Sequence, residues 1–342
     1  MRKIVGLVFV GLGVALIALA IALPSYVYPR IAKAPADPDQ NVVAQGSGIT
    51  VLLAQAESEG GIRVLENQDV TVTRRVRGEV RPDATRAEDG NAFYRLAFLT
   101  EVANQKNGLL TAYVEGGSFD GKTGMSNNCC GDYLSTDPTD PVGEPIRHEG
   151  LQFKFPFETQ KQNYPFWDVN VKKAVTAKFE DTETIDGLLT YRFVQPITDV
   201  VISQEEVPGS LLQLPDQASV KADRLYSTTR TLWVEPHTGA IIKGSEKVNQ
   251  RLVFNGKQTP VIQGTITYND ATVKANVKEY KSSAQGLRFV KSVGPLVGWI
   301  LGPILILVGA ALLLLGPRRR PAAHRDAETS PDDAEASRKQ KI

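Results

Sequence analysis

The stretch VGPLVGWILGPILILVGAALLLL, residues 293–315, decides the architecture of this chain of 342 residues. It holds no ionisable side chain. A helix of this length, rising about 1.5 Å per residue, matches the roughly 30 Å hydrocarbon core of a bilayer. Arg318, Arg319 and Arg320 follow it. Because Lys and Arg gather on the cytoplasmic flank of a membrane helix, the sequence predicts a span that ends in the cytoplasm.

A second apolar run opens the chain. Residues 4–23, IVGLVFVGLGVALIALAIAL, follow Arg2 and Lys3 and carry no charge. Two interpretations stay open: a retained membrane helix, or a cleaved signal peptide with its processing site at ALA, residues 18–20. The helix is favoured because the apolar region of a signal peptide usually stops at about 7–15 residues.

Basic residues at both ends indicate two crossings, with both termini in the cytoplasm and the main domain outside. We therefore expect a plasma-membrane protein. The expected segments are a cytoplasmic N-terminus (1–3), a transmembrane helix (4–23), a juxtamembrane linker (24–40), an extracytoplasmic β-rich domain (41–286), a juxtamembrane segment with the second transmembrane helix (287–315), and a disordered cytoplasmic tail (316–342).

Glycines recur every four residues along the second span, at Gly294, Gly298 and Gly302. A face of small residues lets membrane helices approach each other closely. The expected partner is the first span, through Gly11 and Ala15, or else a second copy of the chain or another envelope protein. Both kinds of pairing stay open.

Between the spans, alternating or β-branched patterns dominate, as is typical of strands. Turn pairs such as Asp-Gly at 120–121 and Asn-Gly at 255–256 separate them. The sequence predicts a large, mainly antiparallel, barrel-like β domain. Arg74, Arg75 and Arg77 on one strand are interpreted as a solvated face. The predicted strand stretches are 69–80, 92–102, 109–119, 187–197, 230–248, 257–268 and 271–280; residues 207–217 are expected to hold a single helical turn.

Signatures of enzymatic chemistry are absent from the sequence. It contains only three histidines, His148, His237 and His324, and no G-x-S-x-G, Walker A or dinucleotide-binding motif. The acidic loop with Asp132, Asp137, Asp140 and Glu144 does not have the spacing of a calcium loop. We therefore expect a non-enzymatic protein without catalytic residues, cofactor or metal. The net charge of +1 also argues against a nucleic-acid partner.

The chain has two cysteines, Cys129 and Cys130, which are neighbours in the predicted outer domain. A zinc site needs more ligands than this pair supplies. Three states stay open: a vicinal disulfide, a bond to another chain, or two free thiols. The vicinal disulfide is favoured, and it would stiffen its loop while closing almost no chain.

Four segments occur in an order that resembles the actinobacterial porin-A-like envelope family, and the resemblance covers nearly the whole chain. The segments are SFDGKTGMSNNCCGDY (118–133), GLQFKFPFETQKQNYPFWD (150–168), GLLTYRF (187–193) and TLWVEPHTGAII (231–242).

Two terminal spans around a β-rich ectodomain, with VEPHTG before the last span, also resemble the scavenger-receptor class B family. That resemblance implies a β-barrel ectodomain with an apolar tunnel for lipid. What carries over by motif is a structural hairpin in which Pro236 presets a turn and Gly239 supplies a positive φ. Its residues are Val234, Glu235, Pro236, Thr238 and Gly239.

The leading functional expectation is an ectodomain that binds or conducts a lipid or another apolar envelope molecule, with membrane lipids as partners. The alternatives are a scaffold of an envelope or secretion complex and, third, an extracytoplasmic hydrolase that brings His148 or His237 to a Ser and an Asp. The expected apolar lining comprises Leu151, Phe153, Phe155, Phe157, Leu211 and Leu212.

Overall fold

The computed structural model describes residues 1–55, 61–79, 90–105, 107–137, 140 and 142–315, and these residues form two compact units. The first unit comprises the described residues 1–19 and 297–315. The second unit runs from Ala20 to Leu296. The predicted tail, 316–342, lies outside the described residues.

The first unit is helical. It holds most of α1 (Arg2–Ala22) and of α4 (Gly294–Leu314), which contains Pro303. Within the described residues, the helical stretches Arg2–Ile31 and Asp270–Leu314 are long and apolar enough to cross a membrane by length and composition.

Glycines allow α1 and α4 to pack closely. A Cβ atom added at Gly13 would lie 2.6 Å from the carbonyl oxygen of Gly302, and one at Gly309 would lie 2.7 Å from that of Gly6. The contact on α1 therefore uses Gly13, whereas Gly11 has nothing within 4 Å of an added Cβ. Close backbone approach of this kind stabilises helix pairs in lipid.

The other glycines of the predicted pairing face lie nearby on α4. Gly298 is buried, and a Cβ atom added at Gly294 would lie 2.9 Å from the Leu23 side chain. A second copy or an envelope protein as partner of this face stays a prediction.

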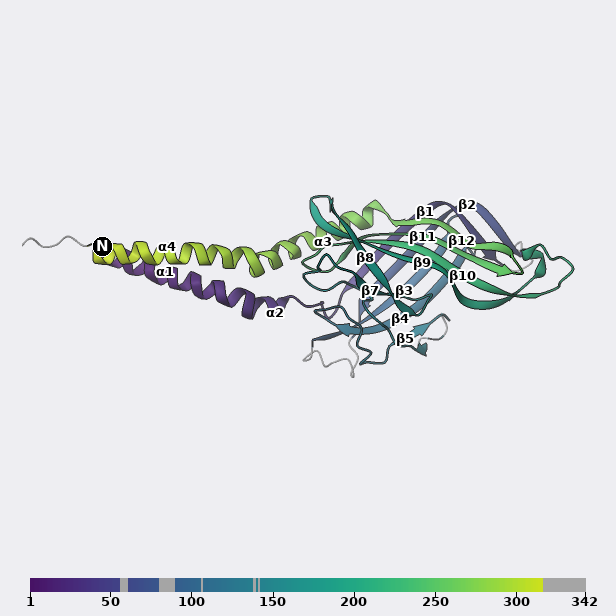
Figure 1. Ribbon diagram of the computed structural model, residues 1–342, viewed down its shortest axis with the longest axis horizontal. Helices are drawn as coiled ribbons and strands as arrows, with labels where there is room; N and C mark the ends of the chain where they lie inside the picture. Colours follow the sequence, from purple (N-terminus) through teal and green to yellow (C-terminus); the bar gives the residue numbers. More distant parts are fainter. Residues whose placement is uncertain (56–60, 80–89, 106, 138–139, 141, 316–342) are drawn as a thin grey trace, which may run out of the picture. The chain divides into compact units, whose positions relative to one another are not determined.

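The second unit is built on one sheet of twelve strands in which every neighbouring pair is antiparallel (Figure 1). The order is β6-β5-β4-β3-β2-β1-β12-β11-β10-β9-β8-β7. The strands are β1 (Asp39–Ala54), β2 (Ile62–Gly78), β3 (Asn91–Val102), β4 (Leu109–Asp120), β5 (Tyr133–Ser135), β6 (Glu144–Pro145), β7 (Tyr164–Asp168), β8 (Lys173–Ile185), β9 (Leu188–Val207), β10 (Val220–Val234), β11 (Ile241–Phe254) and β12 (Lys257–Tyr268).

The sheet curls until its β4 side meets β7. Phe119 at the end of β4 bridges to Ser126, Met125 bridges to Leu151, and Leu151 bridges to Phe166 in β7. These isolated bridges join two strands that are nine positions apart in the sheet order, so the sheet has an inner and an outer face like a barrel.

Residues that were expected to line one apolar tunnel pack in separate parts of the core. Leu151 and Phe155 are fully buried with Phe193 and Val234. Phe153 packs with Tyr94 and Phe119. Leu212 is buried with Val220, Ala222 and Leu252, and Leu211 packs against that group. Phe157 lies under the Lys154 ammonium, 3.7 Å from its ring centre.

The strand predicted at 271–280 is wrong, because this segment belongs to helix α3 (Asp270–Arg288). The Asn269 side chain accepts a hydrogen bond from the Thr272 backbone N–H at 2.9 Å and caps the helix. Val273 and Val277, four residues apart, are buried on the same side as Ala284. The spacing of the two valines fits a helical period as well as an alternating one, and the cap decides between them.

Short helical turns complete the second unit. The π-helical turns η1 (Leu23–Val27) and η5 (Phe289–Val293) flank it, and α2 (Tyr28–Ile31) follows η1. The turn expected in 207–217 is the 3₁₀ helix η4 (Gly209–Leu212).

Candidate functional site

The inner face of the curled sheet carries a row of charged and polar side chains. Gln195 on β9, Arg230 on β10 and Glu246 on β11 lie directly opposite one another in the strand register. Their neighbours two positions along β10, Thr228 and Leu232, are buried. Since residues two apart share a face, this row points inward.

Arg230 is the centre of the row. Its Nη1 donates to the side-chain oxygen Oε1 of Gln195 at 2.8 Å, and its Nη2 donates to Asp168 Oδ2 at 2.9 Å and contacts Glu246 Oε1 at 3.4 Å. The Tyr226 hydroxyl lies 3.1 Å from the same oxygens of Asp168 and Glu246. One guanidinium thus faces two carboxylates, and the group carries a net charge of −1.

Burial and pairing act in opposite directions on these groups. Burial alone would raise the pKa of Glu246, but Arg230 and the hydroxyls of Thr228 and Tyr226 outweigh it and lower that pKa. The pKa of Arg230 is raised, because its carboxylate partners outweigh burial. The side chain of Asp168 is fully buried, whereas that of Glu246 is 33% exposed. Glu246 is therefore the carboxylate of this group that solvent reaches.

A second charged group surrounds His148. Its Nδ1 lies 2.7 Å from Asp132 Oδ2 and its Nε2 lies 3.0 Å from Glu115 Oε1. The Ser118 hydroxyl donates to Asp132 at 2.5 Å, and the Trp167 indole donates to Glu115 at 2.8 Å. All five residues are at most 5% exposed.

Burial would lower the pKa of His148, but the hydrogen bonds and charges of Asp132 and Glu115 outweigh it and raise the pKa to about 9. His148 is therefore an imidazolium ion at neutral pH. Like Arg230, it is one cation between two carboxylates.

The end of β7 connects the two groups. Trp167 bonds to Glu115 on β4, and the next residue, Asp168, bonds to Arg230 on β10. Burial raises the pKa of the Tyr113 hydroxyl, on which the charges of Glu115, Arg230 and Asp168 also act. We call the set the polar belt: Glu115, Asp132, His148, Trp167, Asp168, Gln195, Tyr226, Arg230 and Glu246.

Arg74 lies on β2, away from the strands β9, β10 and β11 that carry Gln195, Arg230 and Glu246, and it faces the interior of the sheet. It lies opposite Phe98, which lies opposite Tyr113, so the three share one face of β2, β3 and β4. The expected solvated face holds only for Arg75 and Arg77, which are exposed and paired with Asp39.

Polar atoms without a protein partner lie beside the belt. Both side-chain polar atoms of Gln152 are buried and have no hydrogen bond among the described residues, as is also true of Lys154 Nζ and Ser126 Oγ. Gln152 packs against Gly117, which follows Glu115 on the inner face of β4. Burial lowers the pKa of Lys154 to about 7. Buried polar atoms of this kind normally bind water.

Cys129 and Cys130 are joined by a vicinal disulfide next to the His148 group. The Cys129 backbone N–H donates to the Ser118 hydroxyl at 3.0 Å, and Cys130 packs with Phe93 and Tyr133. The redox state of this pair in the cell stays a prediction, and mass spectrometry of the unreduced peptide tests it.

The residues of the predicted hairpin join β10 to β11. The buried Glu235 carboxylate accepts hydrogen bonds from the Thr238 N–H at 2.7 Å and the Thr238 hydroxyl at 2.6 Å. Pro236 and Gly239 occupy the turn, and Gly239 has a φ of +72° against the Phe155 carbonyl. This turn is structural and holds the Phe155 core segment in place.

Neither His148 nor His237, the two histidines that the structure describes, is placed in a hydrolase triad. Ser118 donates to Asp132 rather than to His148, so the imidazole has no hydroxyl to deprotonate. His237 contacts Glu158 at 3.1 Å. In the described part of the chain, no group of three or more His, Cys, Asp or Glu side chains is arranged to hold a metal ion.

Sequence reasoning missed Asp168, Gln195, Arg230 and Glu246. A signal for Arg230 was present, because it lies on the same face of its strand as Thr228, Leu232 and Val234, which are buried. A charge on the apolar side of an alternating strand indicates a paired or water-facing interior position. The sequence gives no sign of the partner, because Asp168 lies 62 residues away.

The described residues combine two apolar terminal helices with a large antiparallel sheet that has charged side chains on its inner face, and sheets with a polar interior occur in channel-forming families. The chain belongs to the family described as Porin PorA, whose model matches residues 5–311. It is similar to a Porin PorA of Corynebacterium resistens, with 25% identity over 96% of this chain and 100% of that protein. It is also similar to a Porin PorA of Corynebacterium amycolatum, with 21% identity over 90% of this chain and 98% of that protein.

This family membership confirms the porin-A-like resemblance and corrects two expectations. A lipid-binding or lipid-conducting function is wrong, because porins form channels, and the scaffold alternative gains no support. A plasma-membrane location with cytoplasmic termini is also wrong, because porins belong to outer membranes. The family indicates a channel rather than an enzyme.

Proposed function

We propose that this chain conducts small polar solutes or ions through the interior of its strand unit, and that the polar belt selects them by charge. The observation that carries the proposal is the inward row of Gln195, Arg230 and Glu246, which is joined to the buried Asp168. A polar interior is the property that distinguishes porin barrels from packed ones.

Stability alone does not account for this interior. Each ion moved out of water costs several kcal/mol, and replacing a buried ion pair with packed apolar residues is often neutral or stabilising. The two groups around Arg230 and His148 hold six charges between them. Water in the interior offsets this cost, and the unpartnered atoms of Gln152 support its presence.

The outer faces of the strands favour a role for the helices in membrane contact. Most outward side chains of β10, β11 and β12 carry hydroxyl, amide or charged groups, as at Ser227, Asn249 and Gln263. A membrane-embedded barrel instead shows an apolar outer band about 25 Å tall. In this proposal α1 and α4 hold the chain in a membrane of the cell envelope, and the interior of the strand unit is the water-filled, charge-selecting part of the conducting path.

The test is the conductance of the purified full chain in a planar lipid bilayer, with ion selectivity measured from the reversal potential in a salt gradient. The net charge of −1 around Arg230 predicts a preference for cations. Glu246→Gln removes one negative charge from the carboxylate that is partly exposed to solvent, so we expect it to shift selectivity toward anions. Asp39→Asn, on the exposed outer surface, is the matched control and should leave selectivity unchanged.

Two results would contradict the proposal. The first is a full chain that gives no conductance although circular dichroism shows it folded. The second is a reversal potential that is the same in the wild type and Glu246→Gln, which would place the conducting path outside the belt.

A further inference from the structure

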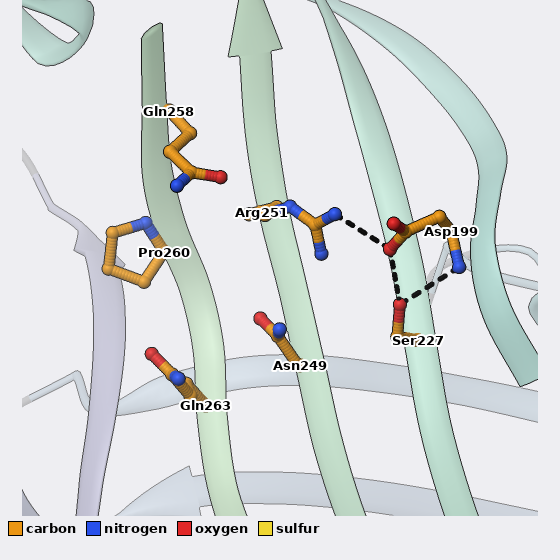
Figure 2. A pocket seen from close by; sticks show the side chains of 7 residues that line it. All are labelled: Asp199, Ser227, Asn249, Arg251, Gln258, Pro260 and Gln263. Carbon is orange, nitrogen blue, oxygen red and sulfur yellow. Dashed lines mark hydrogen bonds and ion pairs between the residues drawn. The ribbon is translucent and has the colours of Figure 1, made fainter. Parts of the chain in front are cut away.

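The outer face of the sheet has a hollow of about 620 Å³ that is independent of the polar belt (Figure 2). It lies over β10, β11 and β12 and the adjoining part of β9. The strand register shifts at this level in two ladders, between Gln250 and Arg251 and between Tyr226 and Thr228. Such bulges bend a sheet and redirect its side chains. The lining residues are Asp199, Ser227, Asn249, Arg251, Gln258, Pro260 and Gln263.

One side of the hollow is fixed by a small network. Arg251 Nη2 donates to Asp199 Oδ1 at 2.6 Å, and the Ser227 hydroxyl donates to the same oxygen at 2.7 Å. The Asp199 N–H donates back to Ser227 at 2.9 Å, and Asp199 has a φ of +49° at the bulge. The guanidinium and the carboxylate neutralise each other, so the hollow carries no net charge from this pair.

The other side presents three free amides. Figure 2 shows the side chains of Asn249 and Gln263 on neighbouring strands and Gln258 directed toward Arg251. No described residue hydrogen-bonds to the side-chain amides of these three residues. Each amide therefore offers donors and an acceptor to a ligand. The Pro260 ring adds an apolar surface between them.

This combination fits one chemical class. A sugar hydroxyl both donates and accepts, as an amide does, whereas an anion needs donors and an unpaired cation. The ring face of a sugar is apolar and matches a proline. Because Arg251 is already paired with Asp199, the hollow favours a neutral polyhydroxylated ligand over a phosphate or carboxylate.

The polar surface continues beyond the hollow along the strands. On β10 it passes from Ser227 to Thr229 and Thr231, and on β12 from Gln263 to Thr265 and Thr267, in matching register. Between them β11 adds Ser245 and the exposed Lys247. Four residues along a strand span about 13 Å. The geometry points to a binding site for a linear neutral glycan, which enters the hollow and lies along this stripe of hydroxyl groups beside the Lys247 ammonium.

The test uses the labelled full chain on an array of neutral and anionic glycans, in lauryldimethylamine oxide because a sugar-based detergent would compete. We expect binding to neutral linear glycans. The double variant Asn249→Ala with Gln263→Ala removes two neutral hydrogen-bonding side chains, so the affinity for the best glycan should fall about tenfold. The matched control is Gln162→Ala with Gln285→Ala, which removes two exposed amides elsewhere and should bind like the wild type.

Three outcomes would overturn the glycan site: no binding to any glycan, binding to anionic glycans alone, or equal binding by the Asn249/Gln263 variant and the wild type. The conductance of that variant should equal the wild-type value, because its side chains face outward. Loss of glycan binding with unchanged conductance therefore separates this site from the proposed channel.

Discussion

The Arg230 and His148 groups have the same charge and differ in how the chain builds them. Each is a buried cation between two carboxylates. Arg230, Gln195 and Glu246 face one another across hydrogen-bonded neighbouring strands, whereas His148 and Asp132 come from loops that reach β4. Arginine stays charged at every accessible pH, and an imidazole does not. The fold therefore holds a permanent cation, Arg230, on a strand of the sheet and a titratable cation, His148, in a loop beside β4.

The largest expected effect is that of Asp168→Ala. This change removes the fully buried carboxylate that accepts from Arg230 and Tyr226, and leaves a buried cation with the partly exposed Glu246. Breaking a buried pair from one side costs about 3–5 kcal/mol. Urea unfolding of the full chain in detergent, followed by tryptophan fluorescence, measures the loss.

The matched control is Glu180→Gln, which breaks the partly exposed pair with Arg192 at 3.2 Å. Exposed pairs contribute about 0–1 kcal/mol, so its unfolding curve should nearly overlay the wild type. Equal effects of the two variants would show that Asp168 and Arg230 are not buried together.

The next effect is a pH dependence that the His148 group has and the Arg230 group lacks. The pKa of His148 is raised to about 9 when folded, against an ordinary value of about 6.5. Its contribution is therefore complete below about pH 6.5 and is lost as the pH rises through 9. We expect the free energy of unfolding to fall by a few kcal/mol over that interval.

His148→Gln keeps a side chain that can hydrogen-bond but cannot titrate. It should be less stable than the wild type at pH 6 and should lack the decline between pH 6.5 and 9. A wild-type stability that is flat over this interval would mean that the imidazole is neutral when folded.

The sequence predicts the parts of this molecule that depend on local pattern. The apolar runs of α1 and α4, most strands and the 235–240 turn follow from composition and alternation. Arg74 shows the limit: it lies among Arg75 and Arg77 in a charged run, yet alternation turns it inward while the other two face water. The belt depends on pairs such as Asp168 and Arg230, which only the closure of the sheet brings together.

A smaller effect on the free energy of unfolding is expected at helix α3, part of which the alternating pattern wrongly predicts as a strand. Asn269→Ala removes the side-chain acceptor for the Thr272 N–H at the start of α3. Loss of such a cap costs about 1 kcal/mol. Ser282→Ala, at an exposed position within α3, is the control and should be neutral or slightly stabilising, because alanine has the higher helix propensity. An Asn269→Ala variant as stable as its control would contradict the capping role.

The smallest effect on stability is expected on the outer surface, where one carboxylate, that of Asp39, lies between two arginines. This arrangement has the charges reversed relative to the two buried groups, in which one cation lies between two carboxylates. Hydrogen bonds from Arg75 and Arg77 lower the pKa of Asp39 to about 2. The folded pKa lies below the ordinary value of about 3.9, so any stabilisation is present above pH 4 and is lost as the pH falls toward 2. Water and salt screen charges at a fully exposed position, and Asp39→Asn should leave the unfolding curve unchanged at pH 7 in 0.15 M salt. An Asp39→Asn variant as damaged as Asp168→Ala would mean that the number of ionic contacts, rather than burial, sets the energetic importance of a charge in this fold.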